Sequence, residues 1–192
     1  MSARDEILAA VRGALHGADK AETPVPRGYR SVVAAGDVID LFARRVVDYR
    51  AGLTRCSREE LPAVIREALG PARKVLVPEG FPVPVEGVPD AADLGSCDAV
   101  VTTAALGIAT TGTIVLDHGP GQGRRALTLV PDRHVCVLSE DQIVSGVPQA
   151  IARLDPARPQ TWISGPSATS DIELDRVEGV HGPRTLHVIV TP

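Results

Sequence analysis

The sequence predicts an α/β protein in which helices cover the faces of a mainly parallel sheet, with a helical extension at the N-terminus. The first observation is that short Val- and Ile-rich runs alternate with segments of helical periodicity across residues 36–192. The second is a hydrophobic content of 44% with only 3% aromatic residues, so aliphatic side chains must fill the core. The third is a polar, proline-containing stretch at 18–31. It divides the 192-residue chain into a helix with its linker (1–35) and one domain (36–192).

The N-terminal helix is expected over residues 2–17. Ser2 can cap it, and Asp5 stands three residues later, which is the spacing of a capping box. The helix carries an apolar stripe made of Ile7, Leu8, Val11 and Leu15. This stripe must be buried either on the chain's own domain or on a partner.

The domain is expected to begin with helices at 37–52 and 57–70, separated by a short strand at 53–56. Ser57 and Glu60 form a capping box for the second of these helices. Strands follow at 73–78, 99–101 and 113–116, and two more lie within 126–139, separated by Pro131 and Asp132. The remaining elements are a helix at 140–154 kinked near Pro148, a strand at 160–163, a short helix at 169–179 with a capping box of Ser170 and Glu173, and a strand at 185–190.

The net charge and the shortness of the apolar runs indicate which partners and which location to expect. The net charge of -4 argues against nucleic acid as the main partner and gives no support for an anionic membrane surface. No apolar run approaches the roughly 18–20 residues of a membrane span. The N-terminus also lacks the apolar core of a signal peptide. We therefore expect a cytoplasmic protein.

The sequence predicts neither a metal site nor a bound cofactor. The three cysteines, Cys56, Cys97 and Cys136, are isolated, which is typical of reduced, packed thiols and does not suit an iron–sulfur cluster held by this chain alone. Closely spaced histidine pairs of the zinc-binding type are missing. The glycine loop at 117–125 lacks the ending of a Walker A motif, and neither a dinucleotide-binding motif nor a nucleophile elbow is present.

The first candidate site follows the strand at 160–163. Ligands of open α/β sheets bind beyond the carboxyl ends of the strands, and a helix that starts there favours an anion through its free amides. The candidate ligand-binding residues are Ser164, Gly165, Pro166, Ser167, Thr169 and Asp171, with Gly182 from the later Gly-Val-His-Gly-Pro segment. Plain helix capping by Ser170 and Glu173 explains several of these polar residues without any ligand.

Two glycine-containing segments are further candidates. In 106–116, Gly112 allows close approach of a ligand to the backbone, and Thr111 and Thr113 supply hydroxyls. A tight turn between two strands is the competing interpretation. In 117–125, Arg124 or Arg125 could clamp a carboxylate or a phosphate. Here a mobile hairpin with solvated charges is the alternative.

Two histidines are candidate catalytic residues. His134 begins an expected strand, and His181 lies between glycines in the Gly-Val-His-Gly-Pro segment. Either could act as an acid–base group near neutral pH. His187 lies inside the last expected strand and is interpreted as a core or edge residue.

Five segments, in order, resemble one known family. They are GIATTGTIVL, LVPDRHVCVL, EDQIV, ISGPSATSDIE and GVHGPRTLHVIV. Together they are similar to the LUD family, the lactate-utilisation domain, and to the cluster-free component of a three-component bacterial system. The resemblance is strong over 98–190 and looser before that. The paired signatures around Ser164–Ser167 and His181–Pro183 are specific, whereas the glycine–threonine segment alone is not.

The resemblance implies a fold similar to the NagB/RpiA/CoA-transferase class, a three-layer α/β/α sandwich. It also implies a role in oxidising L-lactate to pyruvate, as an accessory, regulatory or small-anion-binding subunit without a cofactor of its own. The partners would be a small carboxylate or phosphate and the iron–sulfur redox subunits of the system, and self-association is left open. The motif positions carried over are Gly112, Thr113, His134, Ser164, Gly165, Pro166, Ser167, Asp171, Glu173, His181, Gly182 and Pro183.

One departure from the family pattern bears on chemistry. Thr110 stands where the family commonly has a glutamate, and Ala168 stands where a polar residue is frequent. Because a glutamate in this context acts as a nucleophile in the CoA-transferase-like class, we do not expect covalent carboxylate chemistry at Thr110. The alternative function is an independent enzyme of the CoA-transferase, phosphosugar-isomerase or cyclo-ligase class that acts on a phosphorylated or CoA-linked ligand.

Overall fold

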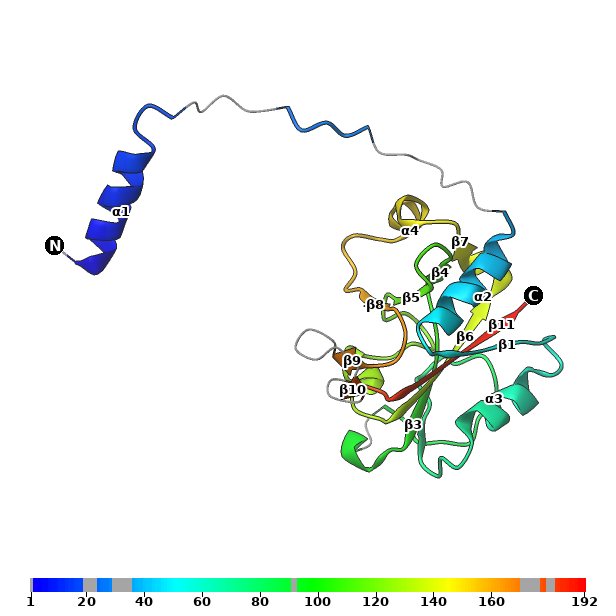
Figure 1. The fold of residues 1–192 in the computed structure, drawn as a ribbon. Helices are drawn as coiled ribbons and strands as arrows, with labels where there is room; N and C mark the ends of the chain where they lie inside the picture. Colours follow the sequence, from blue (N-terminus) through cyan, green and yellow to red (C-terminus); the bar gives the residue numbers. More distant parts are fainter. Residues whose placement is uncertain (1, 19–23, 29–35, 91–92, 170–176, 179–181) are drawn as a thin grey trace.

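A five-stranded parallel sheet forms the centre of the domain in the computed structural model (Figure 1). The structure describes residues 2–18, 24–28, 36–90, 93–169, 177–178 and 182–192. The strand order is β1-β11-β6-β3-β2, with bounds Gly52–Arg55, Thr185–Thr191, Arg133–Ser139, Ala99–Thr103 and Val75–Leu76. All four pairings are parallel. The carboxyl ends of the strands therefore meet at one edge, and the expected α/β class with a mainly parallel sheet is confirmed.

A second, four-stranded sheet was not anticipated from the sequence. Its order is β7-β4-β5-β8, with bounds Ile143–Val144, Leu106–Ile108, Thr113–Leu116 and Thr161–Ile163. Strand β5 is antiparallel to both β4 and β8. This arrangement makes 106–116 a hairpin. It also removes β8 from the parallel sheet, where the strand at 160–163 was expected to lie.

The two faces of the parallel sheet are covered by different elements. Helix α3 (Leu61–Leu69) packs Ile65 with strand residues such as Val101 and Val135 on one face. On the other face, α2 (Val38–Asp48) packs Phe42 and Val46 together with the second sheet. Helix α4 (Val147–Arg153) lies against the second sheet. The molecule thus has three layers, and the second sheet makes up part of one outer layer.

The starts of α1 and α2 agree with the sequence. The start of α3 does not, because Ser57 and Glu60 exchange the expected hydrogen bonds but the helix begins only at Leu61, without a side-chain cap. Asp37 caps α2 by accepting hydrogen bonds from the amides of Ile39 and Asp40. Helix α1 (Ala3–Ala14) has the expected capping box of Ser2 and Asp5, and none of its residues is buried. Its apolar stripe stays exposed, with Ile7 64% and Val11 48% accessible.

Two expected elements are wrong in the part of the chain between β5 and α4. Residues 126–130 do not form a strand, because Arg125–Thr128 is a 3₁₀ helix, η2, that buries Leu127. The expected helix at 140–154 is instead a 3₁₀ turn, η3 (Glu140–Gln142), then β7, then α4. Ser139 caps the start of this turn, and the side-chain oxygen of Gln142 accepts a hydrogen bond from the Ser139 amide. Pro148 lies in the first turn of α4, where its missing amide costs nothing, so it starts that helix and does not kink one.

The expected helix at 169–179 is not supported by the described residues at its ends. Strand β9 (Ala168–Thr169) pairs antiparallel with β10 (Val177–Glu178). Residues 170–176, with Ser170 and Glu173 among them, lie outside the described residues. The anion-binding helix start proposed for this segment therefore has no structural support, and the residues before it must be judged by their own contacts.

Candidate functional site

One cavity of about 290 Å³ collects most of the residues that the motifs single out. We call it the amino-end cavity, because it lies at the start of strands β6 and β11, where His134 and Leu186 line it. The other lining residues are Arg125, Thr128, Leu129, Thr161, Trp162, Ile163, Ser164, Gly165, Pro166, Ser167, Gly182 and Pro183.

The two signature segments meet at this cavity. The amide of Ser167 donates a hydrogen bond of 2.9 Å to the carbonyl of Pro183, which joins the Ser-Gly-Pro-Ser segment to the Gly-Pro segment. Gly165 turns the chain with a φ of 83°, and a Cβ there would lie 2.8 Å from the Cβ of Tyr49. Only glycine fits this turn without moving α2's end, since L side chains rarely adopt this backbone conformation.

The turn at residues 111–113 holds Ser164, which is part of the cavity wall. The hydroxyl of Thr113 lies 2.7 Å from the hydroxyls of both Thr111 and Ser164. Gly112, with a φ of 59°, packs so closely on α2 that a Cβ would lie 2.6 Å from the carbonyl carbon of Arg45. The cavity is not lined by Thr111, Gly112 or Thr113 themselves. Their contribution is to hold Ser164 in place.

His134 is a neutral, buried side chain. Its exposed fraction is 1%, and its Nε2 lies 2.7 Å from the hydroxyl of Thr102. Burial lowers the pKa of His134 to about 4, because the apolar surroundings disfavour the charged imidazolium. Cys136 on the same strand is also kept neutral, because burial raises the pKa of its thiol to about 12. At neutral pH, His134 can therefore offer a hydrogen bond but carries no exchangeable positive charge.

The remaining predicted residues divide between this cavity and other places. Arg125 lines the amino-end cavity, whereas Arg124 makes an ion pair on the surface, with its Nε 2.9 Å from Asp90. Thr169 lies in β9. Asp171 and His181 lie outside the described residues. His187 is half-buried with its Nε2 2.9 Å from the Thr54 hydroxyl, which agrees with its interpretation as a core or edge residue.

The segment after residue 163 was predicted as a site because ligands bind beyond the carboxyl ends of parallel strands. The strand before it is not one of these strands. Strand β8 leads into Ser164, but it belongs to the antiparallel part of the second sheet. The carboxyl ends of the parallel strands lie elsewhere, around a second cavity of about 920 Å³ that we call the carboxyl-end cavity. Its lining includes Thr103, Ser139 and Thr191, the last residues of β3, β6 and β11. Sequence reasoning missed this cavity.

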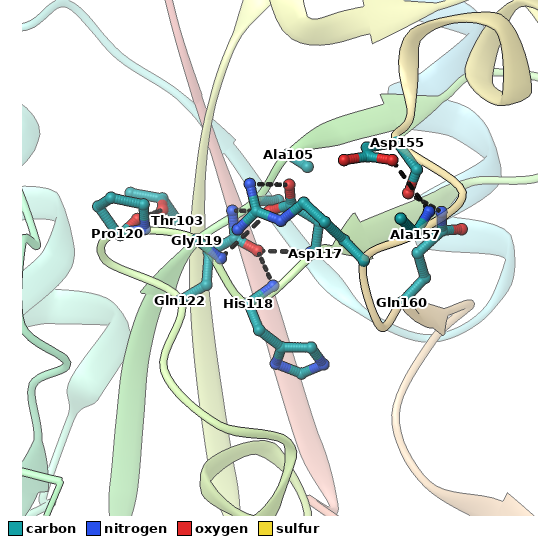
Figure 2. Close-up of polar contacts among 12 residues, drawn as sticks. Thr103, Ala105, Asp117, His118, Gly119, Pro120, Gln122, Asp155, Ala157 and Gln160 are labelled. Atoms are coloured by element: carbon teal, nitrogen blue, oxygen red, sulfur yellow. Dashed lines mark hydrogen bonds and ion pairs between the residues drawn. The ribbon is translucent and has the colours of Figure 1, made fainter.

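The glycine loop after β5 forms one wall of the carboxyl-end cavity and is tightly held (Figure 2). The side-chain oxygen of buried Gln122 accepts hydrogen bonds from the amides of Asp117 and His118, at 2.7 and 3.1 Å. Its amide nitrogen donates to the Asp117 carboxylate at 2.9 Å. Arg158 completes the set through an Nη1–Oδ2 distance of 3.0 Å to Asp117. The loop is therefore an ordered wall around a buried glutamine, and not the mobile hairpin that the sequence left open as an alternative.

In the described ranges, no three His, Cys, Asp or Glu side chains come together as a metal ion would require. No helix among the same residues is both long and apolar enough to cross a membrane.

Comparisons with known proteins support the family resemblance that the signature segments indicated. The family model described as "LUD domain" matches residues 39–191. "Lactate utilization protein C" of Deinococcus radiodurans is 46% identical over 202 residues, 98% of this chain and 95% of the relative. The protein of the same name from Bacillus subtilis is 33% identical over 100 residues, 47% of this chain and 41% of the relative. A crystal structure of a DUF162 family protein from Deinococcus radiodurans matches with a TM-score of 0.70 and 42% identity, covering 84% of this chain and 100% of that one. The chain belongs to the LUD domain family.

Proposed function

We propose that this chain is a component of a bacterial L-lactate utilisation system and binds a small carboxylate, lactate or pyruvate, in the amino-end cavity. The observation that carries the proposal is the near full-length likeness to a protein named for lactate utilisation. The cavity supports it, because the signature segments that define the resemblance meet there.

The chemistry of the cavity suits a small anion. Its volume of about 290 Å³ is at the lower limit of ligand pockets, which span roughly 300–1,000 Å³. Arg125 supplies the positive charge and a fork of donors that matches a carboxylate. Ser164 and Ser167 supply hydroxyls that can donate to the carboxylate or accept from the substrate hydroxyl.

The same cavity favours binding over acid–base catalysis. A general base works best when its pKa lies near the working pH, whereas the pKa of His134 is lowered to about 4. Thr110 stands at the position of the family's usual glutamate and offers no carboxylate nucleophile. Its backbone amide donates a hydrogen bond to the carbonyl of Ser145. The subunit would therefore hold or sense lactate or pyruvate, and the electron transfer would belong to iron–sulfur partner subunits.

The only tryptophan of the chain provides a direct assay, because Trp162 lines the amino-end cavity. Titration with L-lactate or pyruvate should change its fluorescence in a saturable manner. Arg125→Gln should weaken this binding by about tenfold or more, since a charge-assisted hydrogen bond is lost. Arg124→Gln is the matched control, because that side chain pairs with Asp90. Equal binding by both variants, or no saturable change with either acid, would reject the site.

The role in the system is tested separately from the site. A bacterium that lacks its own lactate utilization protein C should recover growth on L-lactate when it expresses this chain, and the tagged chain should retain the iron–sulfur subunits on an affinity column. Restored growth without any retained subunit would argue against a subunit role.

A further inference from the structure

Helix α1 carries an apolar face that the described part of the chain leaves open. Ile7, Val11 and Leu15 are 64%, 48% and 53% exposed, and no residue of the helix is buried. A helix of 12 residues is marginal in water unless its apolar face packs against something. Its start is nevertheless well defined, because Ser2 and Asp5 form a complete capping box. The helix therefore has a strong local signal for formation and an apolar face that needs a partner.

The residues on this face have the spacing of a coiled-coil seam. Four side chains follow one another at intervals of four, three and four residues, namely Arg4, Leu8, Val11 and Leu15. In this alternation two helices pack along a common line, and each side chain enters a gap between side chains of the other helix. Ile7 widens the seam on one side. The pattern therefore selects a second helix as the partner of α1.

The charges beside the seam indicate that the second helix is another copy of α1. Asp5 and Arg12 are seven residues apart, so both lie along the same side of the seam. When two copies pack antiparallel, a two-fold axis brings this side of one helix against the same side of the other. Asp5 of each copy then lies near Arg12 of the other copy. The capping box occupies only Oδ2 of Asp5, so Oδ1 remains available to accept from that guanidinium.

Arg4 specifies the direction in which the two helices run. In an antiparallel pair with Leu8 opposite Val11 of the other copy, Arg4 lies opposite Leu15. Its aliphatic stem can cover that leucine, and its guanidinium reaches the last turn of the other helix, where free carbonyl groups and the helix dipole favour a cation. In a parallel pair, Arg4 would face Arg4 of the other copy and place two like charges in the seam. The parallel arrangement is thus disfavoured by repulsion.

We propose that α1 is a self-association element through which two copies of this chain pair, with their first helices antiparallel. The seam consists of Leu8 against Val11 and Arg4 against Leu15 of the other copy, each contact made twice by symmetry. Because the seam is short, we expect a reversible dimer whose population depends on concentration, and not an obligate one. The pairing involves none of the residues of the amino-end cavity, so it stands independently of the proposed ligand site.

Sedimentation velocity of the full chain, between about 1 μM and 1 mM, tests the pairing. The mean mass should rise from that of a monomer toward that of a dimer. Val11→Asp should raise the dissociation constant at least about tenfold, because it places a charge in the seam. Ala9→Asp is the matched control, since it adds the same residue to the same helix on the side facing away from the seam and should leave the association unchanged.

Disulfide trapping gives the direction of the helices. The background is Cys56→Ser, which removes the one cysteine that is not buried. A tagged chain with Arg4→Cys, mixed with a chain carrying Leu15→Cys, should form a mixed disulfide because the two positions face each other. Leu15→Cys alone should not cross-link, since its two copies would lie about 16 Å apart along the helix axis, beyond the reach of a disulfide.

Three results would overturn the proposal. The first is a wild type that stays monomeric at about 1 mM; a lower melting temperature of Val11→Asp than of Ala9→Asp would then show that α1 packs on its own domain. The second is a dimer that Val11→Asp leaves intact, which would place the contact on another surface. The third is a Leu15→Cys chain that cross-links with itself as readily as with Arg4→Cys, which would mean that the helices are not antiparallel.

Discussion

The buried imidazole of His134 should make the stability of this protein depend on pH in a defined window. The pKa of His134 is lowered from 6.5 to about 4 by burial. Between these values the unfolded chain binds a proton that the folded chain does not bind, so the free energy of unfolding falls as the pH falls. The stabilisation is complete above about pH 6.5 and fully lost below about pH 4. The difference corresponds to about 3 kcal/mol.

The variant His134→Gln isolates this contribution. Glutamine does not titrate but can still hydrogen-bond to the hydroxyl of Thr102. The substitution will lower stability at pH 7 because it changes a fully buried side chain, so the informative quantity is the slope with pH and not the value at any one pH. Urea unfolding followed by circular dichroism, at several values between about pH 7.5 and pH 4.5, gives the free energy of unfolding for both chains.

We expect the wild type to lose up to about 3 kcal/mol more than His134→Gln over this range. His187→Gln is the control, because the pKa of His187 is also lowered by burial but that side chain is only half-buried. This control should keep most of the wild-type slope. If the wild type and His134→Gln instead lose stability in parallel, His134 is not held neutral by burial and the argument is refuted.

Two further substitutions test local features of the fold by urea unfolding at neutral pH. Gly165→Ala should destabilise the protein by about 2 kcal/mol, because the left-handed backbone costs about 1–2 kcal/mol and the new Cβ would press on Tyr49; an unchanged midpoint would show that the turn relaxes freely. Thr191→Val should stabilise it by about 1 kcal/mol, because it removes a buried hydroxyl that has no partner in the described structure. A loss of stability would mean that this hydroxyl is satisfied in solution.

Elements whose signals are local could be predicted from the sequence. The start of α2 at Asp37 and the capping box of α1 follow from residues three or fewer positions apart. The β-branched runs of β6 and β11 predicted buried strands for the same reason. The order of the sheet was beyond such reasoning, because β1 pairs with β11, more than half the chain away.

The wrong expectations share one physical cause, which is that tertiary pairing overrides local pattern. The segment 160–163 has the composition of a strand in a parallel sheet, and only its pairing with β5 shows that it is not one. In 140–154, helical periodicity was real, but the pairing of β7 with β4 interrupts it and leaves an α-helix only from Val147 onward. The errors concern the type, position or extent of an element, more than whether its apolar residues are buried.

The two cavities differ in how their residues are distributed along the chain, and this decides which one a sequence can reveal. The amino-end cavity is built largely from 161–167 and 182–186, where hydroxyls, glycines and prolines are concentrated and stand out as motifs. The carboxyl-end cavity takes Arg58, Ser139, Arg153 and Thr191 from four separate segments. In the sequence, each of these is an ordinary polar residue near the end of a helix or strand. Only the parallel register, which places the ends of β6 and β11 side by side, brings Ser139 and Thr191 to one cavity.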